Sequence, residues 1–242
     1  MHPVLVVFLY GIVTALSTGL GALPFAFVRS ISPRAVSVAN ALAAGLMLGA
    51  SFGLVAEGTA YGRVQTLAGG VAGVAFILLA QRVVEHHDLA FGRMRGAGAR
   101  QMFVMVLVMT VHSFAEGVAV GVAFGGGATL AAAITIAIAV HNVPEGVAIT
   151  AVLRPRGVPL PACAAWSVFS SLPQPLMAVP AFVFVEAFRP ALPYGIGFAA
   201  GAMVYMVLVE LLPEAYEEAP GALVSLLVSG ALVGMVLFQQ YL

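Results

Sequence analysis

Eight apolar stretches, each long enough to cross a bilayer, follow one another along the 242 residues of this chain. A transmembrane helix needs about 20 consecutive, mostly apolar residues. In lipid the backbone must satisfy its own hydrogen bonds, which a helix does within one segment. We therefore predict eight transmembrane helices, with approximate bounds 3–28, 35–57, 64–84, 101–124, 128–153, 159–185, 190–212 and 220–242.

The composition supports this class. Hydrophobic residues make up 62% of the chain and charged residues only 8%, against roughly 25% charged in a soluble domain. The formal net charge is zero, so nothing suggests a nucleic-acid partner. The single cysteine, Cys163, excludes an intrachain disulfide and a cysteine metal cluster. The first apolar run is too long for a signal peptide, and we expect it to be retained as a helix.

Arginine placement predicts the orientation. Eight arginines lie in or beside the first, third and fifth loops, and two lie on the opposite side. Cytoplasmic loops of membrane proteins carry the excess of basic residues. We therefore expect a protein of the cell inner membrane with both termini on the extracytoplasmic side. The eight are Arg29, Arg34, Arg82, Arg93, Arg95, Arg100, Arg154 and Arg156, and the two are Arg63 and Arg189.

Two short motifs place ionisable residues inside apolar runs. His112 precedes Glu116 by four residues, and His141 precedes Glu145 by four. Residues four apart lie on one face of a helix. The two runs are joined only by residues 125–127, all glycine, which predicts an antiparallel hairpin with both histidines at nearly the same depth.

This pair of motifs predicts a metal site near the membrane midplane. A charged side chain at a helix centre costs about 2.5 to 3.5 kcal/mol on insertion scales, so the two glutamates require compensation. Imidazole nitrogen and carboxylate oxygen are ligands for Zn²⁺, Fe²⁺ and their neighbours. Ser113 and Asn142, each three residues before a glutamate, would add oxygen ligands. Pro144 would add the carbonyl of Val140, which it leaves without a helical donor. The simpler alternative is a buried cluster of His–Glu hydrogen bonds that only holds helices together.

The sequences HSFAEG and HNVPEG in adjacent helices resemble the fourth and fifth transmembrane helices of the ZIP (Zrt/Irt-like) metal transporters, closest to the prokaryotic GufA-like branch. The resemblance covers essentially the whole chain. It implies transport of Zn²⁺ and related ions toward the cytoplasm through eight helices in a 3+2+3 arrangement. It also implies that His112, Glu116, His141, Asn142 and Glu145 form the metal site.

The sixth run departs from that family. ZIP relatives often carry glutamate where Gln174 stands and asparagine where Ser113 stands. Gln174 remains a candidate metal residue, but a neutral amide is a poorer divalent ligand than a carboxylate, so we expect one bound ion with at most a transient second. Two prolines, Pro173 and Pro175, are expected to break this helix and to free two backbone carbonyls, those of Phe169 and Ser171, for an ion.

A faint internal repeat relates the second and seventh runs, through residues 43–47 (AAGLM) and 199–203 (AAGAM). Because these helices run in opposite directions, the match predicts an inverted relation between helices 1–3 and helices 6–8 within one transport domain, residues 1–242. Glycines spaced four apart are read first as packing positions within the chain, with a homodimer face or a sliding surface as alternatives. They are Gly45, Gly49 and Gly53; Gly117 and Gly121; Gly197 and Gly201; Gly230 and Gly234.

Acidic residues near helix ends are candidates for the ion's entrance and exit. Glu57 lies near the outer end of the second run, and Glu210 and Glu214 lie at the inner end of the seventh, with Pro213 between them. Residues 86–88 (His-His-Asp) occupy the third loop, where weak metal capture is weighed against a plain solvated loop.

Two other classes of protein stay open. A membrane-embedded zinc hydrolase would also use His/Glu helix faces, but the H-E-x-x-H pattern is missing and the two arms offer no spare base. A non-transporting structural membrane protein is the other alternative. We expect a transporter for Zn²⁺, with Fe²⁺, Mn²⁺ and Cd²⁺ as further ions, and not an enzyme.

Overall fold

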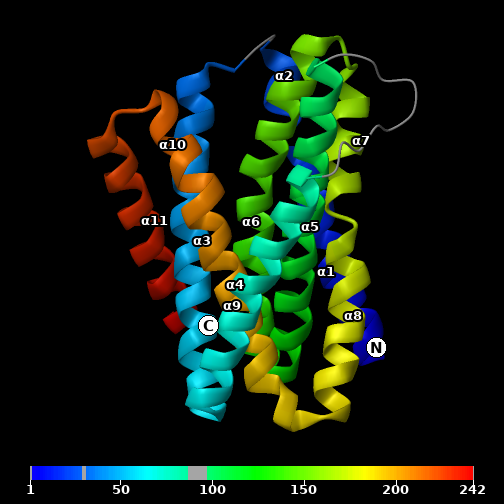
Figure 1. Ribbon diagram of the computed structural model, residues 1–242, viewed down its shortest axis with the longest axis vertical. Helices are drawn as coiled ribbons and strands as arrows, with labels where there is room; N and C mark the ends of the chain where they lie inside the picture. The colour runs from blue at the N-terminus through cyan, green and yellow to red at the C-terminus, as the bar shows by residue number, and fades with distance from the viewer. Residues whose placement is uncertain (1, 29–30, 87–96, 242) are drawn as a thin grey trace.

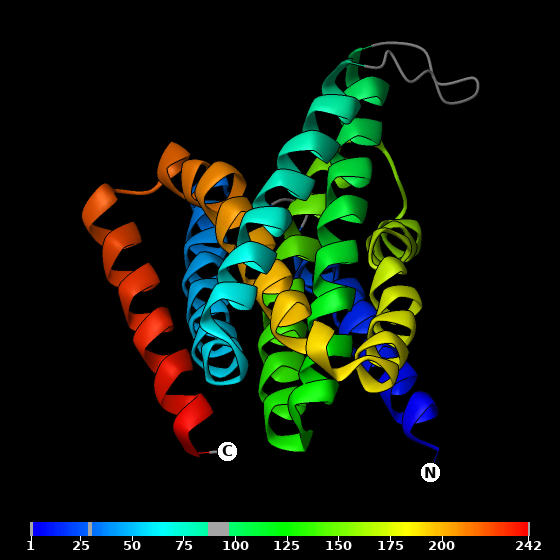
Figure 2. The same ribbon diagram turned by 60° about the horizontal axis from the view of Figure 1, so that its bottom comes forward.

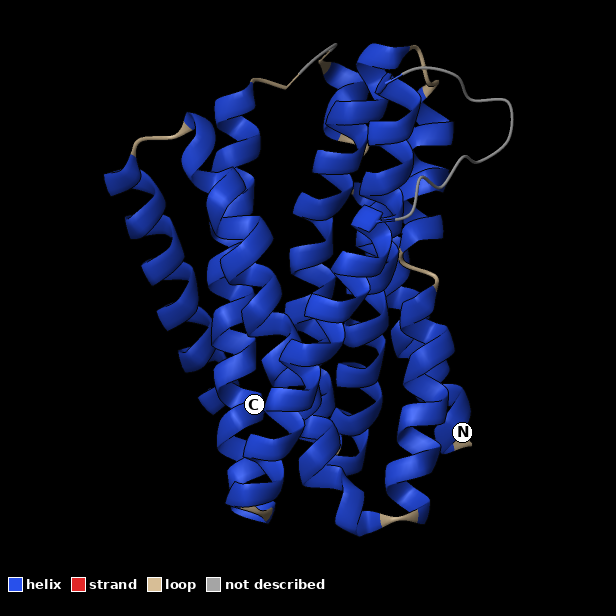
Figure 3. Ribbon diagram, in the orientation of Figure 1, coloured by secondary structure: helices blue, strands red, loops and turns tan. Residues whose placement is uncertain are grey.

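The computed structural model describes residues 2–28, 31–86 and 97–241, without the side chains of residues 81, 83–86, 97–108, 111 and 155. Within these ranges the chain is helical and contains no strand (Figures 1 and 3). The first helices are α1 (Pro3–Leu20), α2 (Pro24–Phe27), α3 (Pro33–Tyr61), α4 (Arg63–His86), α5 (Ala97–Gly126) and α6 (Ala128–Leu153). After a short turn, Arg154–Arg156, follow α7 (Leu160–Ser170), α8 (Pro173–Ala187), α9 (Leu192–Met206), α10 (Leu212–Glu218) and α11 (Gly221–Tyr241).

These helices confirm the polytopic all-α prediction. Within the described residues, seven helical segments are long and apolar enough to cross a membrane. The eighth predicted segment is α5, which is 30 residues long and whose side chains are described only in part. Two predicted spans consist of two helices each. The first is kinked between α1 and α2, and the sixth is divided into α7 and α8.

A one-residue link joins α5 to α6. Gly127 adopts φ 125°, a conformation that L side chains rarely take, and its carbonyl accepts the first hydrogen bond of α6 from the Ala131 N–H. The glycines therefore reverse the chain at once. The predicted hairpin is confirmed, and α6 has the predicted bounds, 128–153.

The predicted proline break lies between α7 and α8. The turn at residues 171–172 ends one helix and begins the next at Pro173. However, the carbonyl of Phe169 accepts from the Leu172 N–H at 3.2 Å, and that of Ser171 accepts from the Gln174 N–H at 3.0 Å. The expectation that both carbonyls are free was therefore wrong, because the turn itself supplies tighter donors.

The seventh span is also irregular. Between α9 and α10 the residues Val207–Leu211 form one π-helical turn, in which the Leu212 N–H donates to the carbonyl of Val207. The next residue, Pro213, has no N–H to continue an α-helical ladder. The wider turn keeps the span continuous and changes the direction of the side chains it carries, among them Glu210.

Helix pairing follows a regular exchange. The main pairs are α4 with α9 and α3 with α11, and likewise α1 with α6 and α5 with α8 (Figures 1 and 2). If spans 1, 2 and 3 are exchanged with spans 6, 7 and 8, and the two central spans with each other, the α4–α9 pair becomes the α11–α3 pair. The α1–α6 pair likewise becomes the α8–α5 pair. This pairing supports the inverted repeat, which remains a prediction.

Three of the four glycine stripes pack within the chain. The α3 glycines contact α11, those of α5 contact α8, and those of α9 contact α4. An added Cβ at Gly230 or Gly234 of α11, in contrast, would meet no described atom within 4 Å. Intrachain packing is therefore correct for three stripes, whereas the fourth faces away from the described chain.

Candidate metal site

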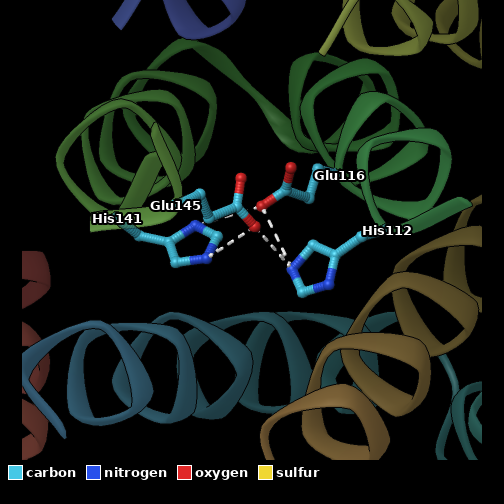
Figure 4. A group of neighbouring side chains, drawn as sticks. All are labelled: His112, Glu116, His141 and Glu145. Carbon is cyan, nitrogen blue, oxygen red and sulfur yellow. Dashed lines mark ion pairs between the residues drawn. The ribbon is translucent and has the colours of Figure 1, made fainter. Parts of the chain in front are cut away.

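The hairpin brings the two His/Glu motifs together at the same level of α5 and α6. The imidazole rings of His112 and His141 are nearly parallel, with centroids 5.6 Å apart. Figure 4 shows the four side chains extending from these two helices toward α3 and α9. One donor atom from each residue lies within 4.8 Å of all the others. The prediction that His112 and His141 lie at nearly the same level of the two helices is therefore confirmed.

Several nitrogen–oxygen distances in the cluster are close to those of a small coordination sphere. His112 Nε2 lies 3.1 Å from Glu145 Oε1 and 3.9 Å from Glu116 Oε1. His141 Nδ1 lies 3.1 Å from Glu116 Oε1, and its Nε2 lies 3.3 Å from Glu145 Oε1. Bonds of about 2.0–2.1 Å to a tetrahedral Zn²⁺ imply ligand separations of ~3.3 Å. The cluster can therefore enclose one such ion with small adjustments.

These groups are buried and poorly satisfied. The exposed fraction is between 0% and 4% for each of the four residues. Although the ion-pair distances are short, both ring nitrogens of each histidine and one oxygen of each glutamate have no hydrogen-bond partner among the described residues. An unsatisfied buried polar atom costs about 1–3 kcal/mol. A cation at the centre would satisfy these atoms together.

Amide side chains hold this cluster from behind. Gln174 Nε2 donates to Glu116 Oε2 at 2.6 Å, and Gln174 Oε1 accepts from Asn142 Nδ2 at 3.1 Å. Asn142 Nδ2 also donates to the carbonyl of Thr14 on α1 at 2.7 Å. The structure thus places Gln174 and Asn142 beside the site, with Gln174 using both polar atoms on its neighbours. Asn142 Oδ1 has no described partner and is the atom of this pair that remains for an ion.

The glycine that follows each motif glutamate lets another helix approach. A Cβ on Gly117 would lie 2.6 Å from the carbonyl oxygen and 2.8 Å from the Cα of Gln174. A Cβ on Gly146 would overlap the carbonyl of Thr18 on α1. These contacts require the absence of a side chain. The motif therefore encodes the packing of its supporting helices as well as the ligands.

The π-turn after α9 brings Glu210 to the opposite side of the cluster. Glu210 Oε2 lies 3.6 Å from His112 Nδ1, and its side chain is 15% exposed. Glu210 was predicted as a possible exit residue, and the structure places it beside the ligands. The sequence alone did not show this, because the π-turn alters the helical phase.

Glu214 lies further out, where α3 meets α10. Its Oε2 accepts from Asn40 Nδ2 at 2.9 Å, and its carbonyl accepts from Ser37 Oγ at 3.0 Å. Asn40 is 2% exposed and was missed by the sequence analysis. A polar amide inside an apolar span was the signal that could have revealed it.

Glu57 lines a separate pocket at the end of the molecule that carries the α5–α6 turn. This pocket has a volume of about 600 Å³ and is formed by α3, the start of α6 and the end of α11, including Gln239 and Gln240. Three residues of α6 that are at most 3% exposed lie between it and the His/Glu cluster: Ile134, Ala137 and Ile138. The pocket and the cluster are therefore separated by packed hydrocarbon.

The remaining predicted groups have different outcomes. Ser113 is fully buried beside the cluster, and its hydroxyl has no described hydrogen-bond partner. Pro144 lies inside an unbroken α6, and the Val140 carbonyl remains a predicted ligand. The side chain of His86, and residues 87 and 88, lie outside the described part of the chain.

Fold and site together define a polytopic helical membrane protein with a buried His₂Glu₂ cluster suited to a divalent cation. Residues 82–239 match the family model described as ZIP Zinc transporter, so the chain belongs to the ZIP family. The family resemblance of the two motifs is therefore confirmed.

Three relatives illustrate the similarity. The chain is 42% identical over 215 residues to an Arabidopsis thaliana protein named as a candidate zinc transporter, covering 87% of this chain but only 35% of that protein. It is 34% identical to the zinc transporter ZIPB of Bordetella bronchiseptica, covering 84% of this chain and 70% of the relative. It is 29% identical to the zinc transporter GufA of Myxococcus xanthus, covering 83% and 85% respectively. The chain thus spans about a third of the plant relative's length and most of the bacterial ones.

Proposed function

We propose that this chain transports divalent transition-metal cations, Zn²⁺ first, across a membrane toward the cytoplasm. His112, Glu116, His141 and Glu145 would be the main ligands, with Asn142 Oδ1 and the Ser113 hydroxyl as further oxygen donors. The observation that carries this proposal is the convergence of buried donor atoms that have no hydrogen-bond partner in the described structure. Membership of the ZIP family, and three relatives named for zinc transport, support it.

The surroundings of the cluster favour an ion path that is closed on one side and open on the other. Packed side chains of α6 separate the cluster from the Glu57 pocket, the proposed entrance. On the other side Glu210 is partly exposed and Glu214 lies at the surface. With both termini outside, as arginine placement predicts, this is an inward-facing arrangement. An ion would leave the cluster by passing Glu210 and then Glu214.

The contacts of Gln174 support one tightly held ion. Its amide donates to Glu116 and accepts from Asn142, so it orients two ligands instead of offering a free oxygen. We propose that Gln174 is a positioning residue. We also propose that the chain transports Fe²⁺, Mn²⁺ and Cd²⁺ and that it lies in the cell inner membrane.

Zinc uptake into liposomes that contain the purified protein tests the function. Saturable uptake is expected for the wild type, and its loss for Glu116→Gln and His141→Ala. Glu218→Gln, which removes one exposed carboxylate at the end of α10, serves as the charge-matched control and should transport normally. Unchanged uptake in both ligand variants would contradict the proposed site, and zinc binding without flux would contradict transport.

The comparisons give no support to the hydrolase alternative. A homodimer remains a proposal, with the outward stripe of Gly230 and Gly234 on α11 as its predicted face. Val233 is 53% exposed on the same helix, so a cysteine there in a Cys163→Ser background should form a disulfide between two copies when an oxidant is added. Failure of cross-linking in native membranes would argue against this face.

A further inference from the structure

A groove on the lipid-facing side of the molecule lies apart from the metal cluster. Its volume is about 600 Å³, and none of the four ligand residues lines it. Residues of α3, α4 and α9 line the groove, and α4 crosses in front of α9 in Figure 2. Glycines of α4 and α9 make this crossing close, since a Cβ at Gly201 would overlap the carbonyl of Gly70.

The interior of the groove is apolar and offers no polar side chain that lacks a hydrogen-bond partner among the described residues. Its lining is mainly valine, leucine, alanine and glycine, and its two threonines donate to backbone carbonyls three and four residues earlier. Thr59 Oγ1 donates to the carbonyl of Ala56 at 2.9 Å, and Thr66 Oγ1 donates to that of Gly62 at 2.8 Å. Leu67 and Val71, 70% and 63% exposed, form part of the rim. Hydrocarbon is the occupant that supplies dispersion contacts to such a surface.

One charged residue lies at the end of the groove beside Gly62. Arg63, the first residue of α4, belongs to the lining, is exposed, and has no ion pair with any residue that the structure describes. A guanidinium group binds phosphate through two parallel hydrogen bonds. The groove therefore combines an apolar channel with a phosphate-binding group at its end near the membrane surface.

The dimensions distinguish a lipid chain from a protein helix. The α4 lining extends from Arg63 to Leu78, about 22 Å at 1.5 Å per residue. A helix about 10 Å wide would need ~1,700 Å³ over that length. A hydrocarbon chain about 4.5 Å wide, from carbon contact distances, would need ~350 Å³. A lipid chain therefore fits within about 600 Å³, whereas a helix could enter the groove only in part.

We propose that this groove binds an anionic phospholipid, whose phosphate contacts Arg63 and one of whose acyl chains fills the space between α3, α4 and α9. The site is independent of the proposed metal path, because its lining contains no metal-ligating residue. The choice between this lipid and a second copy of the chain can be made by direct measurement of bound lipid.

Native mass spectrometry of the detergent-purified chain tests the proposal, in titrations with phosphatidylglycerol and phosphatidylcholine of identical acyl chains. The wild type should retain one phosphatidylglycerol with a several-fold preference over phosphatidylcholine. Arg63→Gln should abolish that preference, whereas Arg34→Gln, an exposed arginine outside the groove, should keep it. Equal retention of both lipids by the wild type, or equal effects of the two arginine variants, would overturn the proposal.

A second pair of variants tests the acyl-chain part of the site. Val74→Trp places bulk in the groove and should reduce retention of both lipids while Arg63 is intact. Ala72→Trp adds the same bulk on the exposed face of α4 outside the groove and should retain phosphatidylglycerol normally. Undiminished lipid binding by a folded Val74→Trp protein would sink the idea, as would a dimer that carries no lipid.

Discussion

The metal site has two walls that are built in different ways. One wall is the α5–α6 hairpin, in which continuous helices present a histidine and a glutamate four residues apart. The facing wall comes from the span of α9 and α10, where the π-turn before Pro213 brings Glu210 to His112. A second span interrupted at prolines supports the hairpin from behind, where the break before α8 brings Gln174 to Glu116.

This difference suggests a division of roles. A regular helix holds neighbouring ligands at a fixed separation, so the hairpin wall should determine whether the ion binds. An interrupted helix places its donor through tertiary contacts, and π-turns are frequent at functional sites. We therefore expect the facing wall to modulate binding and release, with smaller effects on mutation.

The largest effect is expected on the hairpin wall. His112→Ala or Glu145→Gln should lower zinc affinity by about 100-fold or more, since even residues that only support metal ligands contribute 10- to 100-fold. Isothermal titration calorimetry in detergent would measure it. Glu186→Gln is a suitable control, because within the described residues Glu186 forms an exposed ion pair with Arg189. A loss of zinc affinity below tenfold would contradict the proposal that the hairpin wall determines whether the ion binds.

Acidification should also act through the hairpin wall. Zinc binding needs neutral imidazole and ionised carboxylate, so protons compete with the metal and affinity should fall as pH decreases. Between about pH 8 and about pH 5, where imidazole ordinarily takes up its proton, we expect a fall of the order of tenfold or more. Equilibrium binding across this range is the measurement. Tighter binding at the acidic end would contradict the His/Glu ligand set.

Glu210 should have an intermediate effect. Glu210→Gln removes the carboxylate 3.6 Å from His112 and should change zinc uptake by about tenfold. Glu214→Gln should have a smaller effect, because that carboxylate lies further out and is bonded to Asn40. Glu217→Gln is the surface control. Equal uptake by all three variants would remove the facing wall from the transport path.

Gln174 offers a gain of function. Gln174→Glu places a second carboxylate beside Glu116, 2.6 Å from the present amide nitrogen, where a cation would be needed to relieve the repulsion. Elemental analysis should find a second equivalent of bound zinc in this variant. Gln65→Glu, in the first turn of α4, should leave the stoichiometry unchanged. Absence of the second ion in Gln174→Glu would mean that more than this amide prevents its binding.

The smallest change tests the packing that supports the hairpin wall. Gly117→Ala should reduce stability by about 1–3 kcal/mol, because its Cβ would overlap Gln174. Gly230→Ala meets no described neighbour and should be neutral or slightly stabilising, since alanine is the better helix former. Thermal unfolding in detergent compares the two. Similar behaviour would show that α8 can move away without consequence.

The sequence by itself predicted the helical spans, the hairpin and the pairing of His112 and Glu116 with His141 and Glu145. Each of these depends on local rules, namely apolar length, four-residue spacing and a glycine turn. The bounds of α6 were correct because its link is a single glycine and its start is abrupt. The position of Gln174 near a helix break also followed from its two prolines.

Only the tertiary structure decided what faces the hairpin. The approach of Glu210 to His112 depends on a π-turn, and the contact of Asn40 with Glu214 joins residues 174 positions apart. The carbonyls of Phe169 and Ser171, which the prolines were expected to leave free, accept hydrogen bonds from N–H groups of the same turn. The spacing of the prolines alone did not reveal these bonds. Local periodicity determines which face of one helix is polar. Which helices meet at that face depends on close packing between distant segments, and that information is not contained in any single stretch of sequence.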